Sequence, residues 1–432
     1  MPSSLKIFLF LFISFHCEAQ DTLNQWRIKY YTEKAERYLD REKALGNFYT
    51  INKDGIKMFA NSTDKAAHKP EFEINWKDIP EFNQLNAYPD DSMFKTYNRG
   101  KFTGNKNAAI APPKHNMNGE KKLSGFKIAI DAGHTAGDAE MGEIEKKNIR
   151  FKKDSLIGLS DSISFAEGML TFATAQLLKK QLEAEGAEVF LTRSFNGATA
   201  FGVTFDSWLK TSYKKAVDSL CKEGEITAEK KKWYLSPKCT KRDKFRLIFK
   251  DIELQKRGEI INNYHPDLTV IIHYNVDETN LGWSKPSNKN LNMTFAGGAF
   301  MAHDLKSNDK RFEFLRLLIT DDLEKSFSFS SEVVKSFEKT LTVKTAGIND
   351  AKYLRESCIA APQKGVFCRN LQLTRFVHGT LVYGETLYQD NFAECKALNK
   401  ETDKTKNERV KQVADAYFHG ILNYVQTKEN TK

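Results

Sequence analysis

Short apolar runs alternate with stretches of helical hydrophobic spacing over most of the chain beyond Gly125. The runs long enough for buried strands are 126–131, 188–193, 267–273 and 379–385. Apolar residues at helical spacing predict helices near 165–185, 249–264, 330–341 and 408–425. Gly186 is placed to end the first of these helices. Strands that alternate with helices predict an α/β fold, with a mostly parallel mixed sheet flanked by helices.

The N-terminal part of the chain has a different pattern. Residues 21–45 are polar with helical spacing, and residues 46–124 carry scattered aromatic side chains among many Asn, Asp, Lys and Pro. We expect a small irregular N-terminal region over 20–124, of unknown role, that is ordered by packing on the main domain 125–428. Within the main domain, three segments look like insertions: 140–164, 195–245 and 277–296.

The first nineteen residues have the pattern of a secretory signal. Lys6 precedes the apolar run 7–15, and a small-x-small site ends at Ala19. A membrane-spanning helix needs about 20 apolar residues, so this run is too short, and no other stretch approaches that length. We therefore predict a cleaved signal peptide over 1–19, no transmembrane segment, and an exported protein that is periplasmic or extracellular.

Composition narrows the class of protein. The 432 residues are 40% hydrophobic and 28% charged, which excludes wholesale disorder and a polytopic membrane protein. The net charge of +10 favours polyanionic surroundings but does not choose among nucleic acid, lipid and cell-wall polymer. Five cysteines remain after the signal and form no CxxC pair, so the odd count leaves at least one free thiol or an intermolecular partner.

Side chains suited to metal binding lie at the ends of the predicted elements. His134 follows the first strand, His273 closes the central strand and Glu385 closes a late strand, while Glu167 begins the main helix. Open α/β sheets bind ligands at the carboxyl ends of their strands, so these side chains are expected to converge. Two imidazoles and one carboxylate suit a catalytic zinc with one open position.

Two further residues near this edge have two interpretations each. Asp131 either orients a ligand imidazole from outside the metal shell or caps the turn before His134. Asn275 either hydrogen-bonds substrate or ends its strand. No HExxH, Walker A or GxSxG motif occurs, so the zincin, P-loop and serine-hydrolase classes lack their signatures.

Four motifs together resemble the zinc-dependent N-acetylmuramoyl-L-alanine amidases of the type 3 family, which cleave peptidoglycan. They are Asp131-Ala132-Gly133-His134, the helix and strand from Glu167 to Arg193, the strand Asp267 to Asn275, and the element Leu381 to Asn391. The last motif departs from the family pattern, because Tyr383-Gly384 precedes the glutamate and Leu387 and Tyr388 replace Gly and Phe. The chain resembles a divergent member of the family with insertions.

The resemblance implies roles for individual residues. His134, Glu167 and His273 would hold Zn²⁺, and Glu385 would be the catalytic carboxylate. The ungapped register from Glu167 to the Thr-Arg pair selects Glu167 as the ligand over the acidic cluster Glu140, Glu143 and Glu145. Residues 125–428 would then be the catalytic domain.

The resemblance also implies a substrate and a compartment. The expected protein is an exported zinc hydrolase that cleaves the amide between N-acetylmuramic acid and L-alanine, with peptidoglycan rather than nucleic acid as its partner. An activator protein is compatible with the sequence, but no pattern identifies one. Two alternatives stay open: a zinc peptidase or carboxypeptidase on another exported substrate, and a catalytically silent module that binds the cell wall.

Overall fold

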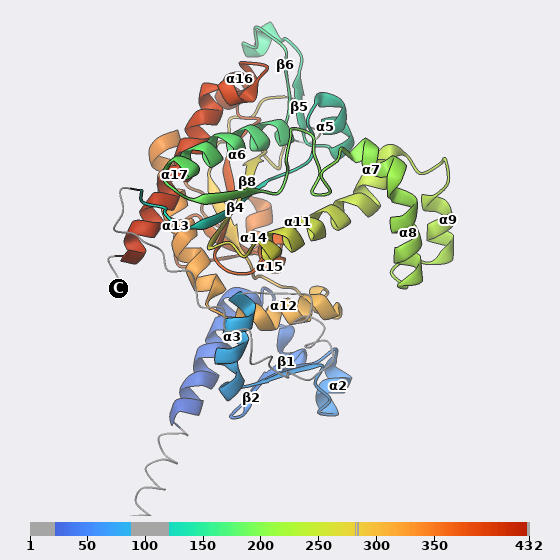
Figure 1. The fold of residues 1–432 in the computed structure, drawn as a ribbon, viewed down its shortest axis with the longest axis vertical. Coiled ribbons are helices and arrows are strands. Elements are labelled where there is room, and N and C mark those ends of the chain that lie inside the picture. Colours follow the sequence, from blue (N-terminus) through green and yellow to red (C-terminus); the bar gives the residue numbers. More distant parts are fainter. Residues whose placement is uncertain (1–21, 88–120, 281, 283–284, 430–432) are drawn as a thin grey trace, which may run out of the picture.

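The computed structural model describes residues 22–87, 121–280, 282 and 285–429, so the predicted signal peptide lies outside the described residues. Its centre is a seven-stranded sheet of order β10-β11-β9-β12-β8-β4-β7 (Figure 1). The four strands β7, β4, β8 and β12 run parallel, β9 is antiparallel to β12, β11 is parallel to β9, and β10 is antiparallel to β11. The strand bounds are β4 Lys127–Ala132, β7 Glu188–Leu191, β8 Leu268–Asn275, β9 Met293–Ala296, β10 Cys358–Ala360, β11 Val366–Arg369 and β12 Leu381–Tyr388. The predicted mostly parallel mixed sheet is confirmed.

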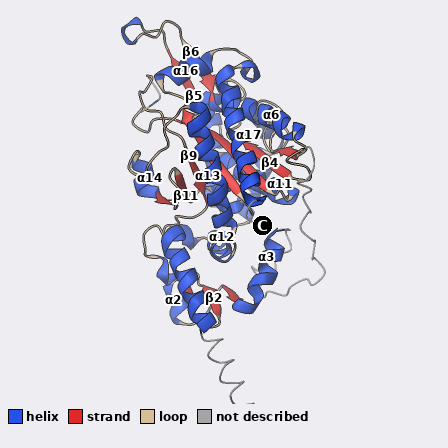
Figure 2. Cartoon of the chain, turned by 90° about the vertical axis from the view of Figure 1, so that its left-hand side faces the viewer, coloured by secondary structure: helices blue, strands red, loops and turns tan. Residues whose placement is uncertain are grey.

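Helices cover both faces of this sheet. Figure 2 shows α13 and α17 side by side against the strands, and α6 packs beside them. Alternate residues of β4 and β8, such as Ile128 and Ile272, are buried under these helices. The intervening residues, such as Ala129 and Ile271, face α11 and α15 on the other side. The helix bounds are α6 Glu167–Ala184, α11 Lys250–Tyr264, α13 Asp322–Leu341, α15 Gln372–Phe376 and α17 Glu408–Glu429.

The segment before α6 differs from the sequence expectation. The helix was expected from residue 165, but β6 (Ile163–Ala166) pairs there with β5 (Asn148–Phe151) as an antiparallel hairpin. Ile163 and Phe165 are buried and Ser164 between them is exposed, which is the alternation expected of a strand. The helix therefore begins at Glu167, directly after the hairpin.

The three expected insertions have ordered structure. Segment 140–164 overlaps α5 (Ala139–Glu145) and contains most of the β5–β6 hairpin. Segment 195–245 forms a helical lobe with an aromatic core around Phe205 and Trp208, visible beside α11 in Figure 1. Its helices are α7 Phe205–Thr211, α8 Tyr213–Lys222, α9 Ala228–Tyr234 and α10 Lys241–Lys244, continued by the π-helix Phe245–Phe249. Segment 277–296 ends in β9, so its last residues belong to the central sheet.

The N-terminal region contains a small sheet, whereas an irregular region was expected. A helix over 22–34 continues as the π-helix Ala35–Leu39, followed by the antiparallel strands β1 (Tyr49–Ile51), β2 (Gly55–Met58) and β3 (Phe72–Asn75). This sheet shares one buried cluster with α12 (Asn308–Ile319) of the main domain. The other helices are α2 Ser62–Ala66, α3 Ile79–Ala87, α14 Lys352–Ser357 and α16 Phe392–Asn399, and the 3₁₀ turns are Leu45–Asn47, Trp76–Asp78, Ser155–Ile157, Asp304–Lys306 and Lys404–Lys406.

Two further expectations concerned membrane-spanning helices and free cysteines. Of the helices in the described ranges, none has the length and apolar character needed to cross a bilayer. The five described cysteines are all free thiols, which agrees with the expectation of at least one.

The contact between the N-terminal sheet and α12 is testable through Phe312. Its fully buried ring lies 5.8 Å from that of Phe72 and 6.4 Å from that of Phe82. Phe312→Ala removes a buried aromatic ring and leaves a cavity, so we expect the free energy of unfolding to fall by about 3–5 kcal/mol in urea denaturation. Phe195→Ala is the matched control, because Phe195 is 43% exposed. Equal stability of the two variants would contradict this packing.

Candidate metal centre

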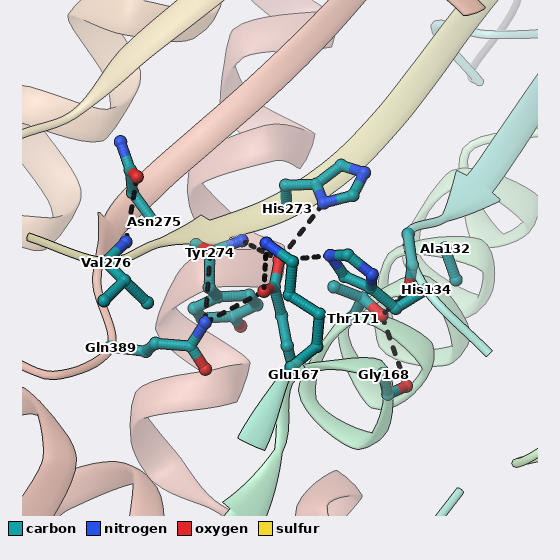
Figure 3. Close-up of polar contacts among 12 residues, drawn as sticks. Ala132, His134, Glu167, Gly168, Thr171, His273, Tyr274, Asn275, Val276 and Gln389 are labelled. Carbon is teal, nitrogen blue, oxygen red and sulfur yellow. Dashed lines mark hydrogen bonds and ion pairs between the residues drawn. The ribbon is translucent and has the colours of Figure 1, made fainter. Parts of the chain in front are cut away.

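The three predicted metal ligands converge at one edge of the sheet. His134 follows β4, Glu167 is the first residue of α6, and His273 lies within β8. Oε1 of Glu167 lies 3.1 Å from Nε2 of His134 and 3.1 Å from Nδ1 of His273 (Figure 3). One donor atom from each residue lies within 4.8 Å of the others. The geometry suits a single metal ion held by three side chains.

The turn that presents His134 depends on a glycine and on two buried arginines. A Cβ at Gly133 would lie 2.3 Å from Cε1 of His273, so only glycine allows the two histidines to approach. His134 itself has a left-handed φ of 62°, which is costly for a residue with a Cβ. Arg257 donates to its carbonyl at 2.8 Å, and Arg193 donates to the Gly133 carbonyl at 3.4 Å. These hydrogen bonds hold the turn in its strained conformation.

The carboxylate of Glu167 is fixed from several sides. Oε1 accepts from the Tyr274 amide at 3.2 Å, and Oε2 accepts from Nε2 of Gln389 at 3.0 Å. Burial raises the pKa of Glu167, but His134 and Lys147 outweigh it and hold the pKa well below its ordinary value. The carboxylate is thus ionised and oriented before any ligand binds. Gln389 was not predicted, because it lies beyond the strand end in the most divergent motif.

Glu145, the last residue of α5, orients His134. Its Oε1 lies 3.0 Å from Nδ1 of His134, and its carboxylate accepts from the amides of Thr135 and Ala136 at 3.1–3.3 Å. A carboxylate on the outer nitrogen fixes the tautomer that leaves the other nitrogen for a metal. The only sequence signal for this role is that Glu145, in the acidic cluster, follows His134 by eleven residues.

Asp131, the residue expected as the orienter, has other partners. Its carboxylate accepts from Oγ1 of Thr192 at 2.5 Å and from Nη1 of Arg257 at 3.3 Å, below the turn. Asp131 thereby neutralises the buried guanidinium of Arg257, which itself donates to carbonyls of the turn. These contacts of Asp131 are with neither a ligand imidazole nor a backbone amide of the turn, the two partners expected from the sequence. The orienting contact on His134 belongs to Glu145.

The two imidazoles have opposite electrostatic environments. Burial lowers the pKa of His134, but Glu167 and Glu145 outweigh it and raise that pKa to about 9. Burial and the neighbouring His134 lower the pKa of His273 to about 4. Among the described residues, Nε2 of His134 is buried without a hydrogen-bond partner of suitable geometry. A buried nitrogen of this kind, facing a carboxylate and a second imidazole, fits a metal ion as its missing partner.

Glu385 lies beside this centre without joining it. It is opposite His273 in the pairing of β12 with β8, and its Oε2 is buried with no hydrogen-bond partner in the described part of the chain. Burial and the negative charge of Glu167 raise the pKa of Glu385 to about 8. Asn275 lines the same cleft and donates to the hydroxyl of Tyr353 at 2.9 Å, so it contacts a wall residue of the cleft.

Two hollows flank the candidate ligands. The first is a cleft of about 420 Å³, lined by Glu385, Asn275, Tyr353, Lys147 and Arg369, among others. The second is a cavity of about 210 Å³ whose lining includes His134 and His273. Its apolar wall comes from Phe245, Leu254, Leu371 and Leu373. We call the first the Glu385 cleft and the second the apolar cavity.

Comparison with known proteins gives matches to solved structures only. No protein-family model matches the chain, and no curated protein sequence matches it. The CwlD amidase from Clostridioides difficile, solved in complex with the GerS lipoprotein, matches with 19% identity and a TM-score of 0.36 over 70% of this chain and 99% of that one. The amidase Ami1 from Mycobacterium abscessus matches with 15% identity and a TM-score of 0.37, over 70% and 99% of the two chains.

A third match has similar values. The catalytic domain of CwlV from Bacillus (Paenibacillus) polymyxa var. colistinus is 16% identical with a TM-score of 0.36, over 70% of this chain and 98% of that one. All three are amidases. Ami1 and CwlV are named N-acetylmuramyl-L-alanine amidase and N-acetylmuramoyl-L-alanine amidase, the activity of the family that the sequence motifs resemble. The function proposed for this chain rests on its own residues.

The orienting role of Glu145 is testable by metal binding. Glu145→Ala leaves Nδ1 of His134 and two turn amides without their carboxylate, so we expect metal affinity to fall by about 10–100-fold. Competition with a chromophoric chelator measures this change. Glu143→Ala is the matched control, because exposed Glu143 pairs only with exposed Arg150 at 2.7 Å among the described contacts of its carboxylate. Unchanged affinity in Glu145→Ala would assign the orientation of His134 to the backbone alone.

Proposed function

We propose that the chain is an exported zinc hydrolase that cleaves the amide between N-acetylmuramic acid and L-alanine of peptidoglycan. One observation carries the proposal: His134, Glu167 and His273 converge within 4.8 Å, beside a buried carboxylate that is not among them. Three protein ligands and an open position are typical of catalytic zinc, whereas structural zinc is closed by four. The motifs that supply these residues resemble those of amidases.

Zinc fits the donor set better than the hard divalent cations do. Imidazole nitrogens suit zinc, whereas Mg²⁺ and Ca²⁺ prefer shells made of oxygen. A zinc ion held by His134, Glu167 and His273 would polarise the scissile carbonyl and lower the pKa of a water molecule to about 7.

The side chains around the metal position have distinct tasks. Glu145 holds His134 through Nδ1, Tyr274 and Gln389 hold Glu167, and the ring of Tyr383 stacks on that of His273 at 4.5 Å. Oε2 of Glu385, which has no other partner in the described residues, would accept the proton of the attacking water and pass it to the departing nitrogen.

Two properties of the chain support peptidoglycan as the substrate: its net charge and its expected export. The net charge of +10 favours association with an anionic cell-wall polymer. The predicted signal peptide would place the protein in the periplasm or outside the cell, where peptidoglycan is accessible. A zinc peptidase would leave different products, and a silent wall-binding module would leave none.

Product analysis and metal content test this proposal together. We expect the zinc-loaded protein to carry about one zinc per chain and to release intact stem peptides with a free N-terminal alanine from peptidoglycan. His134→Ala removes one of three ligands, so zinc content and release should both be lost. His303→Ala, at a side chain that is 70% exposed, should retain both. Mass spectrometry of the products separates the alternatives, since peptides cut internally would identify a peptidase instead.

The role of Glu385 requires a variant that keeps its shape. Glu385→Gln removes the proton acceptor, so zinc content should persist while turnover falls by about 10²–10⁴-fold. Glu356→Gln is the matched control, because Glu356 is 60% exposed on α14. Full activity of Glu385→Gln would exclude it as the base. Loss of zinc in that variant would instead make Glu385 a ligand and put the role of Glu167 in doubt.

A further inference from the structure

If the proposed function holds, the position of Glu385 indicates which part of the substrate lies in the Glu385 cleft. A carboxylate that returns a proton to the departing nitrogen must lie on the side where that nitrogen leaves. Of the two hollows beside the metal centre, Glu385 lines only the Glu385 cleft. In the proposed reaction the departing nitrogen belongs to the alanine of the stem peptide. In that reaction the peptide would therefore lie in the Glu385 cleft.

The Glu385 cleft contains a guanidinium that no carboxylate neutralises. Arg369, at the end of β11, lies with its guanidinium 4.8 Å from the ring centre of Tyr353 and 5.1 Å from that of Phe295. Across the described ranges, its side chain makes no hydrogen bond and pairs with no acid. An arginine held by aromatic rings loses little side-chain freedom on binding and keeps its donors for a ligand.

Two of the three acids that line the cleft, Asp277 and Glu278, are already engaged. Asp277 accepts from the Thr279 amide at 3.0 Å and from the Ser287 hydroxyl at 3.1 Å. Glu278 accepts from the amides of Lys352 and Tyr353 at the start of α14, at 2.5 and 3.2 Å. These contacts satisfy both carboxylates locally. Burial raises the pKa of the third acid, Glu385, and the positive charge of Arg369 opposes this rise, but no hydrogen bond or ion pair joins the two side chains in the described residues. The donors of Arg369 thus remain for a group from outside the chain.

A row of side chains in contact, three of them aromatic rings, fixes Arg369 relative to the metal centre. The ring of His273 stacks on Tyr383 at 4.5 Å, Tyr383 contacts Phe295 at 5.9 Å, and Phe295 contacts Arg369 at 5.1 Å. These residues come from the neighbouring strands β8, β12, β9 and β11 and lie on one face of the sheet. The distance from the scissile bond to the guanidinium is therefore set by the sheet.

We infer that Arg369 binds a free carboxylate of the stem peptide next to the scissile bond, so that the enzyme selects peptides that carry this charge. The guanidinium fork matches a carboxylate with two parallel hydrogen bonds. A carboxamide at the same position offers one acceptor and no charge, so it binds more weakly. In a stem peptide this group is the α-carboxylate of a γ-linked D-glutamate that follows L-alanine, and in the alternative chemistry it is amidated.

The experiment compares two N-acetylmuramoyl tripeptides that differ only in whether this α-carboxyl is free or amidated, with the C-terminal carboxyl blocked in both. We expect kcat/KM of the natural protein to be about 10–100-fold higher for the free carboxylate, the range for a hydrogen bond to a charged group. Arg369→Gln should bring the ratio close to 1. Arg369→Lys, which keeps the charge without the fork, should give an intermediate ratio.

Controls separate this inference from the proposed function and from folding. Arg355→Gln, at an exposed arginine of α14, should keep the ratio of the natural protein. A ratio of 1 in the natural protein, or an unchanged ratio in Arg369→Gln, would overturn the inference while amidase activity stands. Cleavage of neither tripeptide and no peptide release from peptidoglycan would overturn the proposed function itself. If Arg369→Gln does not fold, calorimetric binding of the two released tripeptides to the natural protein decides, and equal affinities refute the inference.

Discussion

The carboxylate of Glu167 is the buried charge around which the metal centre is arranged. Only 1% of its side chain is exposed, and taking an isolated carboxylate out of water would cost far more than a domain's entire stability. Two imidazoles, a backbone amide and the amide of Gln389 offset that cost. These partners come from three places in the sheet, the ends of β4 and β12 and the strand β8, so the position of Glu167 constrains all three together.

This constraint explains the second buried network below the His134 turn. Arg257 contacts Asp131 at 3.3 Å and Glu253 at 3.1 Å, and it donates to backbone carbonyls of the turn. Asp131 and Glu253 raise the pKa of Arg257 although burial lowers it, so the guanidinium stays charged. A left-handed histidine needs surroundings that fix its backbone, and the arginine supplies fixed donors to carbonyls that a sheet edge would leave unpaired. The geometry of the candidate ligands is thus held by charges buried below the His134 turn.

The sequence predicted the parts of the fold and site that depend on local patterns. The strands that carry His134 and His273 are buried apolar runs, and the helix after Glu167 has clear apolar spacing, so these ligands could be placed at one sheet edge. The start of that helix was set too early, because the apolar residues of β6 merge with the helical pattern in the printed sequence. Glu145 and Gln389 could not be placed, since their contacts arise only when α5 and the end of β12 fold back over the metal centre. The N-terminal sheet was missed for a similar reason: its short strands are stabilised by packing on α12, from a distant part of the chain.

A similar contrast between local and long-range structure distinguishes the candidate metal ligands from the residues that line the two hollows. The candidate metal ligands stand on or directly after the parallel strands β4 and β8 and on the first turn of α6, where their positions follow from the sheet. The walls of the two hollows come in part from segments that the sequence marked as insertions: Phe245 from the helical lobe lines the apolar cavity, and Glu278 of the 277–296 segment lines the Glu385 cleft. Arg369 belongs instead to the sheet, since it stands on β11 and is held by Phe295 of β9, just as Asn275 and Glu385 stand on β8 and β12. A charge on the frame can specify one feature of the substrate at a fixed distance from the reaction, while loops and inserted helices shape what surrounds it.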